Sequence, residues 1–116
     1  MNLYLQEILR KKIITQLQKS YKNDKKLNDE IFVKEPQNWT HQDFEEVSGC
    51  TSLHTQFLKR LFEYGNKHSD FQISSANRLK IIEFLGYRSW EDLETEMILR
   101  AGVEIFIERF LNKDSR

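Results

Sequence analysis

The sequence predicts an all-α protein, a compact single-domain bundle of about six helices. Apolar residues recur every three or four positions along most of the chain, which is the spacing of one face of a helix. The 116 residues include only four glycines and one proline, so few of the special turns that sheets and phosphate loops require can form. The length fits one domain, and a 39% hydrophobic content is enough for one core.

Residues 1–22 are predicted to form a basic amphipathic helix. Its apolar side includes Leu9, Ile13 and Leu17, which are four residues apart. The opposite side is basic and is a candidate surface for contacts with phosphate groups. The cations of this candidate surface are Lys11, Lys12, Lys19 and Lys22, followed by Lys25 and Lys26 in the next segment.

Residues 23–38 are predicted to be a polar connection, within which "IFV" at residues 31–33 is expected to pack on the core as a tether. A helix is expected to begin after it at Thr40, because Thr40 is followed three residues later by Asp43 in a variant of the capping box. Pro36 disfavours helical geometry at the residue before it, which supports this boundary. Gly49 is expected to end the helix in the left-handed conformation.

A second helix is expected from Leu53 to Tyr64, capped by Thr51 or Ser52. With about 100° per residue, its leucines and phenylalanines share one broad sector with His54. The opposite sector holds four polar side chains. In a helix-turn-helix, hydroxyl and amide groups at such positions contact base edges while cations contact phosphates. The candidate nucleic-acid-binding residues are therefore Thr55, Gln56, Lys59 and Arg60, although two helices joined by a turn are also common in ordinary cores.

The rest of the chain is expected to be helical. Ser74 or Ser75 caps a helix that ends before Gly86, and Ser89 caps the next one. Residues 40–95 are predicted to form a helix-turn-helix-like core. A C-terminal helix is predicted to follow it at residues 96–112. The apolar face of this C-terminal helix either closes the core of the monomer or pairs with the same helix of a second copy. Such a homodimer would carry two copies of the helix that reads the nucleic acid. The residues of this face are Val103, Phe106, Ile107 and Phe110.

Charge and residue usage exclude several classes of function. The net charge is zero, although residues 1–34 carry eight Lys or Arg against four Asp or Glu, so only local nucleic-acid contacts are expected. A glycine-rich phosphate loop, a nucleophile motif and zinc-ligand spacing are absent, so neither enzymatic activity nor a metal or cofactor is expected. The charges within residues 1–18 exclude a membrane span there, and a cytoplasmic location is expected.

Two stretches resemble a helix-turn-helix module that is widespread in proteins of Bacteroidota. They are "FLKRLFEYG" and "LKIIEFLGYRSWEDL", and the resemblance covers roughly residues 40–95. It implies a nucleic-acid-binding scaffold with a Gly86 helix end and a Ser89 cap. Where the family opens its reading helix with a Ser and a Thr, this chain has His54 and Phe57. The resemblance therefore implies that the scaffold is retained while the surface that would read bases is altered.

A second resemblance is one of general type. The small, neutral chain, with its basic first helix and acidic last helix, resembles the proteins that phages and mobile elements use as regulators or as inhibitors of bacterial defence. It is similar in character to an anti-CRISPR protein of Bacteroidota directed at a type VI, RNA-targeting effector. The alternative partner is then a CRISPR effector or its guide RNA, where charge complementarity would orient association.

Overall fold

The computed structural model describes residues 1–21, 27–64 and 71–111, and it confirms the all-α prediction. The described part of the chain contains five α-helices instead of about six. They are α1 (Leu3–Tyr21), α2 (His41–Thr51), α3 (Thr55–Lys59), α4 (Ser75–Leu85) and α5 (Trp90–Phe106). Two 3₁₀ turns precede α2, namely η1 (Asp29–Phe32) and η2 (Pro36–Asn38), and π-helical turns extend α3 and α5 as η3 (Arg60–Tyr64) and η4 (Ile107–Leu111).

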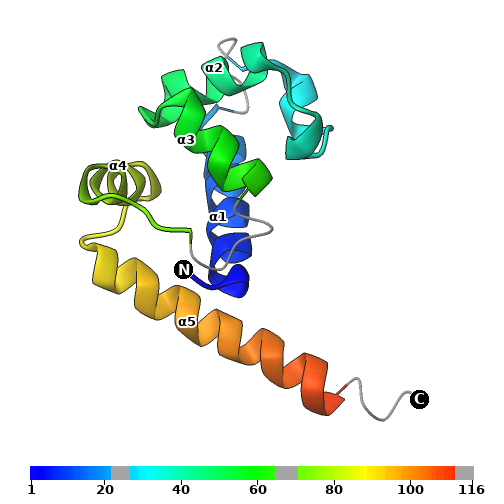
Figure 1. The fold of residues 1–116 in the computed structure, drawn as a ribbon, viewed down its shortest axis with the longest axis vertical. Coiled ribbons are helices and arrows are strands. Elements are labelled where there is room, and N and C mark those ends of the chain that lie inside the picture. The colour runs from blue at the N-terminus through cyan, green and yellow to red at the C-terminus, as the bar shows by residue number, and fades with distance from the viewer. Residues whose placement is uncertain (22–26, 65–70, 112–116) are drawn as a thin grey trace.

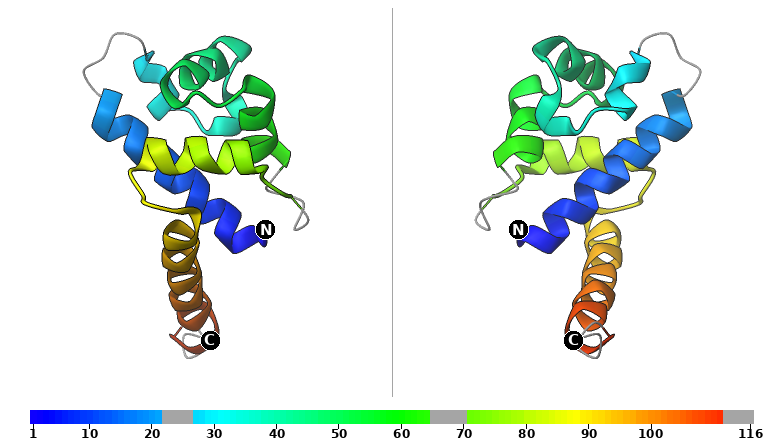
Figure 2. Two further views of the ribbon diagram at one scale, coloured as in Figure 1. Left: turned by 90° about the vertical axis from the view of Figure 1, so that its left-hand side faces the viewer. Right: turned by 90° about the vertical axis from the view of Figure 1, so that its right-hand side faces the viewer.

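Helix α1 lies at the centre of the molecule, with α2 and α3 at one end and α5 at the other (Figure 1). Helix α5 extends away from the body formed by the other helices (Figure 2). The principal extents are 46 × 31 × 26 Å, and the radius of gyration is 15.1 Å. A compact domain of this length has a radius of gyration of about 13 Å, and the projection of α5 accounts for the larger value.

The apolar side of α1 supplies the middle of the core, as predicted. Leu9, Ile13 and Leu17 have no exposed surface, and α1 packs against α4, α5 and η3. Arg10, on the same helix, donates a hydrogen bond from Nη1 to the carbonyl of Leu61 in η3, at 3.3 Å. Helix α1 is therefore the element that holds the α2–α3 pair and α5 in one body.

The segment between α1 and α2 is attached to the core by Trp39. Its indole Nε1–H donates a hydrogen bond to the carbonyl of Ile31 at 3.0 Å, and its ring lies 5.4 Å from that of Phe44 and 5.0 Å from that of Phe62. Leu27 and Ile31 are buried in the same core. Although most residues of this connection are polar, its buried apolar side chains pack on the core.

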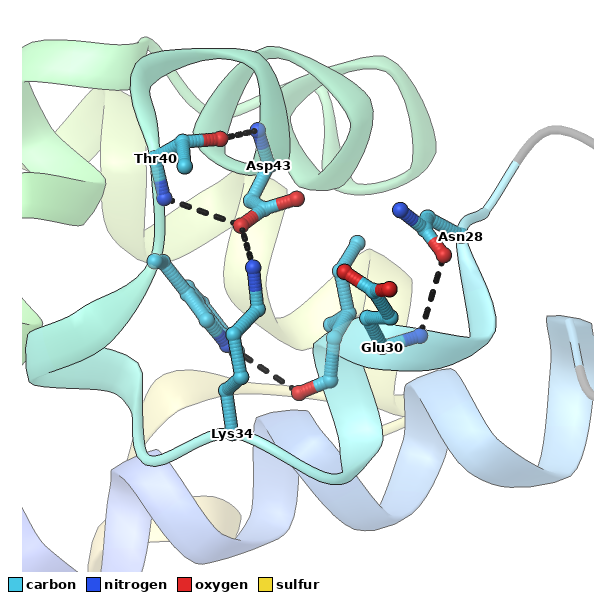
Figure 3. Close-up of polar contacts among 7 residues, drawn as sticks. Asn28, Glu30, Lys34, Thr40 and Asp43 are labelled. Atoms are coloured by element: carbon cyan, nitrogen blue, oxygen red, sulfur yellow. Dashed lines mark hydrogen bonds and ion pairs between the residues drawn. The ribbon is translucent and has the colours of Figure 1, made fainter.

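A complete capping box starts α2, as the sequence predicted (Figure 3). The Thr40 hydroxyl accepts a hydrogen bond from the Asp43 amide at 3.2 Å, and the Asp43 carboxylate accepts one from the Thr40 amide at 2.9 Å. The same carboxylate pairs with Lys34 Nζ at 2.6 Å, while Asn28 caps η1 through the Glu30 amide. These polar contacts fix the direction in which the chain enters α2.

The predicted boundary of the C-terminal helix, residues 96–112, is wrong. Helix α5 begins at Trp90, where the Ser89 hydroxyl accepts a hydrogen bond from the Asp92 amide, and it continues through Gly102 into η4. The two helices expected after Ser89 are therefore one continuous helix. The physical reason is that Leu93, Met97 and Ala101 form a single buried stripe at intervals of four residues, which favours an unbroken helix across the glycine.

Candidate nucleic-acid interface

The turn between α2 and α3 is held by side-chain hydrogen bonds. The Thr51 hydroxyl donates to the carbonyl of Val47 at 2.9 Å and accepts from the Leu53 amide at 3.2 Å, while the Ser48 hydroxyl donates to the carbonyl of Leu53. Ser52, at φ 65°, takes the left-handed conformation that ends α2. Leu53 lies between the two helices, and these hydroxyls give its amide and its carbonyl hydrogen-bond partners.

Gly49 therefore does not end α2, contrary to the prediction. It lies inside the helix, and Ser52 three residues later takes the left-handed conformation. A left-handed serine is strained relative to glycine, and the hydroxyl bonds of Ser48 and Thr51 compensate for this. The sequence offered a glycine at the expected place, but the side-chain bonds that move the helix end are visible only in the structure.

The second helix begins at Thr55 instead of Leu53, so neither Thr51 nor Ser52 caps it. His54 is the N-cap residue, makes no side-chain capping bond and is exposed, whereas its position in the apolar sector predicted burial. The apolar side is otherwise as expected. Its buried residues are Leu53, Phe57, Leu58, Leu61 and Phe62.

The four predicted contact residues of α3 and η3 all reach the surface. Gln56 and Arg60 are exposed, and Thr55 and Lys59 are half-buried. Each pair is four residues apart, so the two pairs form adjacent rows on one side of the helix. The structure thus brings these four side chains together as predicted.

The side chain of Lys59 contacts neighbouring residues that the sequence did not predict. Its ammonium lies 3.0 Å from His41 Nδ1 and 5.9 Å from the centre of the Phe44 ring. Because a lysine ammonium only donates hydrogen bonds, His41 Nδ1 accepts and His41 Nε2–H points to Glu45, at 2.9 Å. Lys59 therefore lies over the start of α2, as a half-exposed cation held by its neighbours.

Arg60 is the more available cation. Its guanidinium lies 5.7 Å from the centre of the Phe71 ring, and the residue is exposed. It is also the first residue of the π-helical turn η3, so it sits where the helix widens. A cation–π contact leaves the guanidinium N–H donors able to bond a phosphate or a base edge.

The predicted basic face of α1 contributes to a cleft whose lining does not include the four α3 residues. Lys11, Lys12 and Lys19 line a cleft between α1, the end of α4 and α5, where Arg100 of α5 joins them. Lys22, Lys25 and Lys26 lie outside the described residues. Arg100 was missed by the sequence analysis, because no periodicity reveals which face of α5 meets α1.

Lys12 is the innermost cation of this group, with 18% of its side chain exposed. Its ammonium donates to Tyr87 Oη at 2.9 Å and to Glu96 Oε2 at 2.7 Å. Burial lowers the pKa of Lys12, but these two hydrogen bonds raise it more, so its pKa is above the ordinary value. The hydrogen bonds from Lys12 and Tyr87 lower the pKa of Glu96. Both groups are therefore charged at neutral pH.

Within the described ranges, no helix combines the length and the apolar character needed to cross a membrane. Comparisons with protein-family models, with curated proteins and with solved structures found no match for this chain.

Proposed function

We propose that the protein is a non-enzymatic nucleic-acid-binding regulator of the cytoplasm that uses the helix-turn-helix-like pair α2–α3. One observation supports this most strongly. The apolar side of α3 and η3 is completely used by the core, and Gln56 and Arg60 extend together from the opposite side into solvent. Amide and guanidinium groups are the side chains best suited to adenine and guanine edges in a major groove.

Duplex DNA is the first ligand to test, because a short exposed second helix matches major-groove docking. Exchanging Lys59→Glu together with Arg60→Glu should weaken binding by about 100-fold or more, since two charge-assisted contacts become repulsive. The slope of log affinity against log salt concentration should fall by about two. Fluorescence anisotropy with labelled duplex DNA and single-stranded RNA measures both quantities.

A matched charge-reversal variant is available on α4 and the turn after it. Among the described residues, the side chains of Lys80 and Arg88 make no hydrogen bond or ion pair, so Lys80→Glu with Arg88→Glu changes the same charge without touching α3. This control should bind nearly as the wild type does. If both double variants lose binding equally, the effect is one of overall charge and the α3 site is wrong.

A second proposal concerns α5, whose outer face is apolar and uncovered. Leu99, Val103, Phe106 and Phe110 are 68%, 59%, 52% and 61% exposed, and Ile107 beside them is also exposed. The rings of Phe106 and Phe110 lie 5.1 Å apart. The sequence left open whether this face closes the core, and in the described part of the chain four of its side chains are more than half exposed.

We propose that a second copy of the chain covers this face. The four residues follow a 4-3-4 spacing, which is the seam that lets a helix pair with an identical helix. Their stripe lies roughly opposite Met97 and Ala101, which pack on the body. A contiguous run of large apolar side chains of this kind marks an interaction surface, and twofold pairing would present two α3 surfaces to a palindromic site.

Leu99→Glu should convert a dimer into a monomer, because a carboxylate in the seam would have to be buried without a partner. Light scattering over a range of concentrations gives the mass directly. Leu79→Glu is the matched control, since Leu79 of α4 is 55% exposed and lies on another helix. A wild-type chain that stays monomeric at every concentration overturns the dimer. A protein partner such as a CRISPR effector would then be the occupant to test.

A further inference from the structure

The cleft between α1 and α5 is a cationic cavity of about 260 Å³. Four basic residues line it, namely Lys11, Lys12 and Lys19 from one helix and Arg100 from the other. Among the described lining residues none is acidic. Ammonium and guanidinium groups are strong hydrogen-bond donors for an anion.

The neutral lining adds hydrogen-bonding and apolar groups. Thr15 and Gln16 of α1 supply a hydroxyl and an amide on the same side as the lysines. Ile8, Leu85 and the ring of Tyr87 supply an apolar part. A site that combines a cationic cluster with an apolar wall suits a ligand with an anionic group joined to an organic body.

Three of the four cations have a carboxylate within 4.0 Å, but two of these pairs are on the exposed rim. Within the described ranges Lys11 pairs with Glu7, at 3.3 Å, and both side chains are more than half exposed. Arg100 is 4.0 Å from Glu104, a separation at the limit of an ion pair, and Lys19 has no ion pair among the described residues. Exposed pairs of this kind contribute little and are readily exchanged.

Glu96 is the carboxylate in the shortest of the three ion pairs that the described cations of the cleft make. It accepts hydrogen bonds from Lys12 and from the Tyr87 hydroxyl, and so fixes both groups at the base of the cavity. It also cancels one positive charge there. Glu96 therefore orients the site and reduces its affinity for an anion, which makes it a useful position for testing.

We propose that this cleft binds a phosphate monoester, with the phosphate held by Lys11, Lys19, Arg100 and Lys12 and the organic part against Tyr87. A monoester carries close to two negative charges at neutral pH and has three acceptor oxygens. It matches several converging cations better than an internal phosphodiester with its single charge. The ligand is either a free small phosphate or the terminal phosphate of a nucleic-acid strand. The inference stands independently of the α3 proposal.

The first test titrates the full chain with adenosine 5′-monophosphate, followed by nuclear magnetic resonance and calorimetry. Saturable binding should shift the amide signals of residues 8–19, 85–87 and 100, and adenosine without phosphate should not bind. A second arm compares a ten-nucleotide single strand that carries a 5′-phosphate with the same strand that carries a 5′-hydroxyl. Preference for the phosphorylated strand identifies a strand end as the source, and binding of the mononucleotide alone identifies a free phosphate.

Variants of the rim test the assigned residues without disturbing the core. Lys19→Ala with Arg100→Ala should weaken binding of the mononucleotide by about tenfold or more, since two charge-assisted bonds are lost. Glu96→Gln should tighten it by about threefold, because a nearby negative charge is removed. Lys80→Ala with Arg88→Ala removes the same number of charges outside the cleft lining and should leave the affinity unchanged.

Absence of saturable binding by both the mononucleotide and the phosphorylated strand overturns the proposal. Equal affinity of the rim variant and its control overturns it as well. The Lys59→Glu, Arg60→Glu variant separates the two proposals. If it loses duplex binding and retains the mononucleotide, both sites are supported independently, and if wild type binds the mononucleotide but no nucleic acid, only the α3 proposal fails.

Discussion

Trp39→Ala is expected to lower the free energy of unfolding by about 3–5 kcal/mol, the usual cost of truncating a buried tryptophan. Trp39 is 6% exposed and packs on Phe44 of α2 and Phe62 of η3. Its loss would leave a cavity between the two helices of the candidate site and an unpaired carbonyl at Ile31. Denaturant unfolding followed by circular dichroism measures the change, which is a large part of the stability of a small domain.

Trp39→Phe is the informative companion to this variant. It keeps an aromatic ring against Phe44 and Phe62 but removes the indole donor, so it should cost less than the alanine variant, about 1–3 kcal/mol. Nucleic-acid binding by Trp39→Phe should stay close to that of wild type under conditions in which the protein is folded. A Trp39→Ala protein that loses less than about 1 kcal/mol would show that this tether does not hold the α2–α3 pair.

Asp43→Ala is expected to cost about 2–3 kcal/mol, because it removes the capping-box acceptor and leaves Lys34 without its carboxylate. Asp43 is only 3% exposed, and its two hydrogen bonds come from Lys34 and from the Thr40 amide. Asp43→Asn should cost less, since an amide oxygen can still accept from Thr40. Lys34→Met removes only the ion pair, and comparison of the three variants separates the cap from the pair.

The Asp43 contribution should also depend on pH. Burial raises the pKa of Asp43, but the hydrogen bonds from Lys34 and Thr40 lower it more, so the folded-state pKa is below the ordinary value. Stability from this group is therefore present above the unfolded pKa of about 4 and is lost as pH falls through the folded pKa. The difference in stability between wild type and Asp43→Ala should shrink as the pH is lowered from about 5. A difference that stays constant over this range would contradict the assigned ionisation.

Several features of the fold and of the candidate site could be predicted from the sequence. Local signals are short in range, so the Thr40 cap, the Ser89 cap and the buried side of α1 were predicted correctly. The outward row of Thr55, Gln56, Lys59 and Arg60 followed from helical spacing alone. Their exposure agrees with that spacing, and their role in binding stays a prediction.

The details of the α3 surface depended on contacts between distant residues. The engagement of Lys59 by His41, and of Arg60 by Phe71, follows from how α2, α3 and the chain after them pack. The end of α2 at Ser52 depends on hydroxyl bonds within the turn that compete with the glycine signal. Helical periodicity specifies which side of a helix is apolar and leaves these partners undetermined.

The sequence by itself determined the helical class, the two capping boundaries and the basic side of α1, because each depends on residues within one or two turns of one another. Only the tertiary structure decided that Arg100 meets the lysines of α1 across a cleft and that the outer face of α5 remains uncovered. Both features depend on the angle at which α5 leaves the body. Packing between helices sets that angle, and no local pattern of residues encodes it.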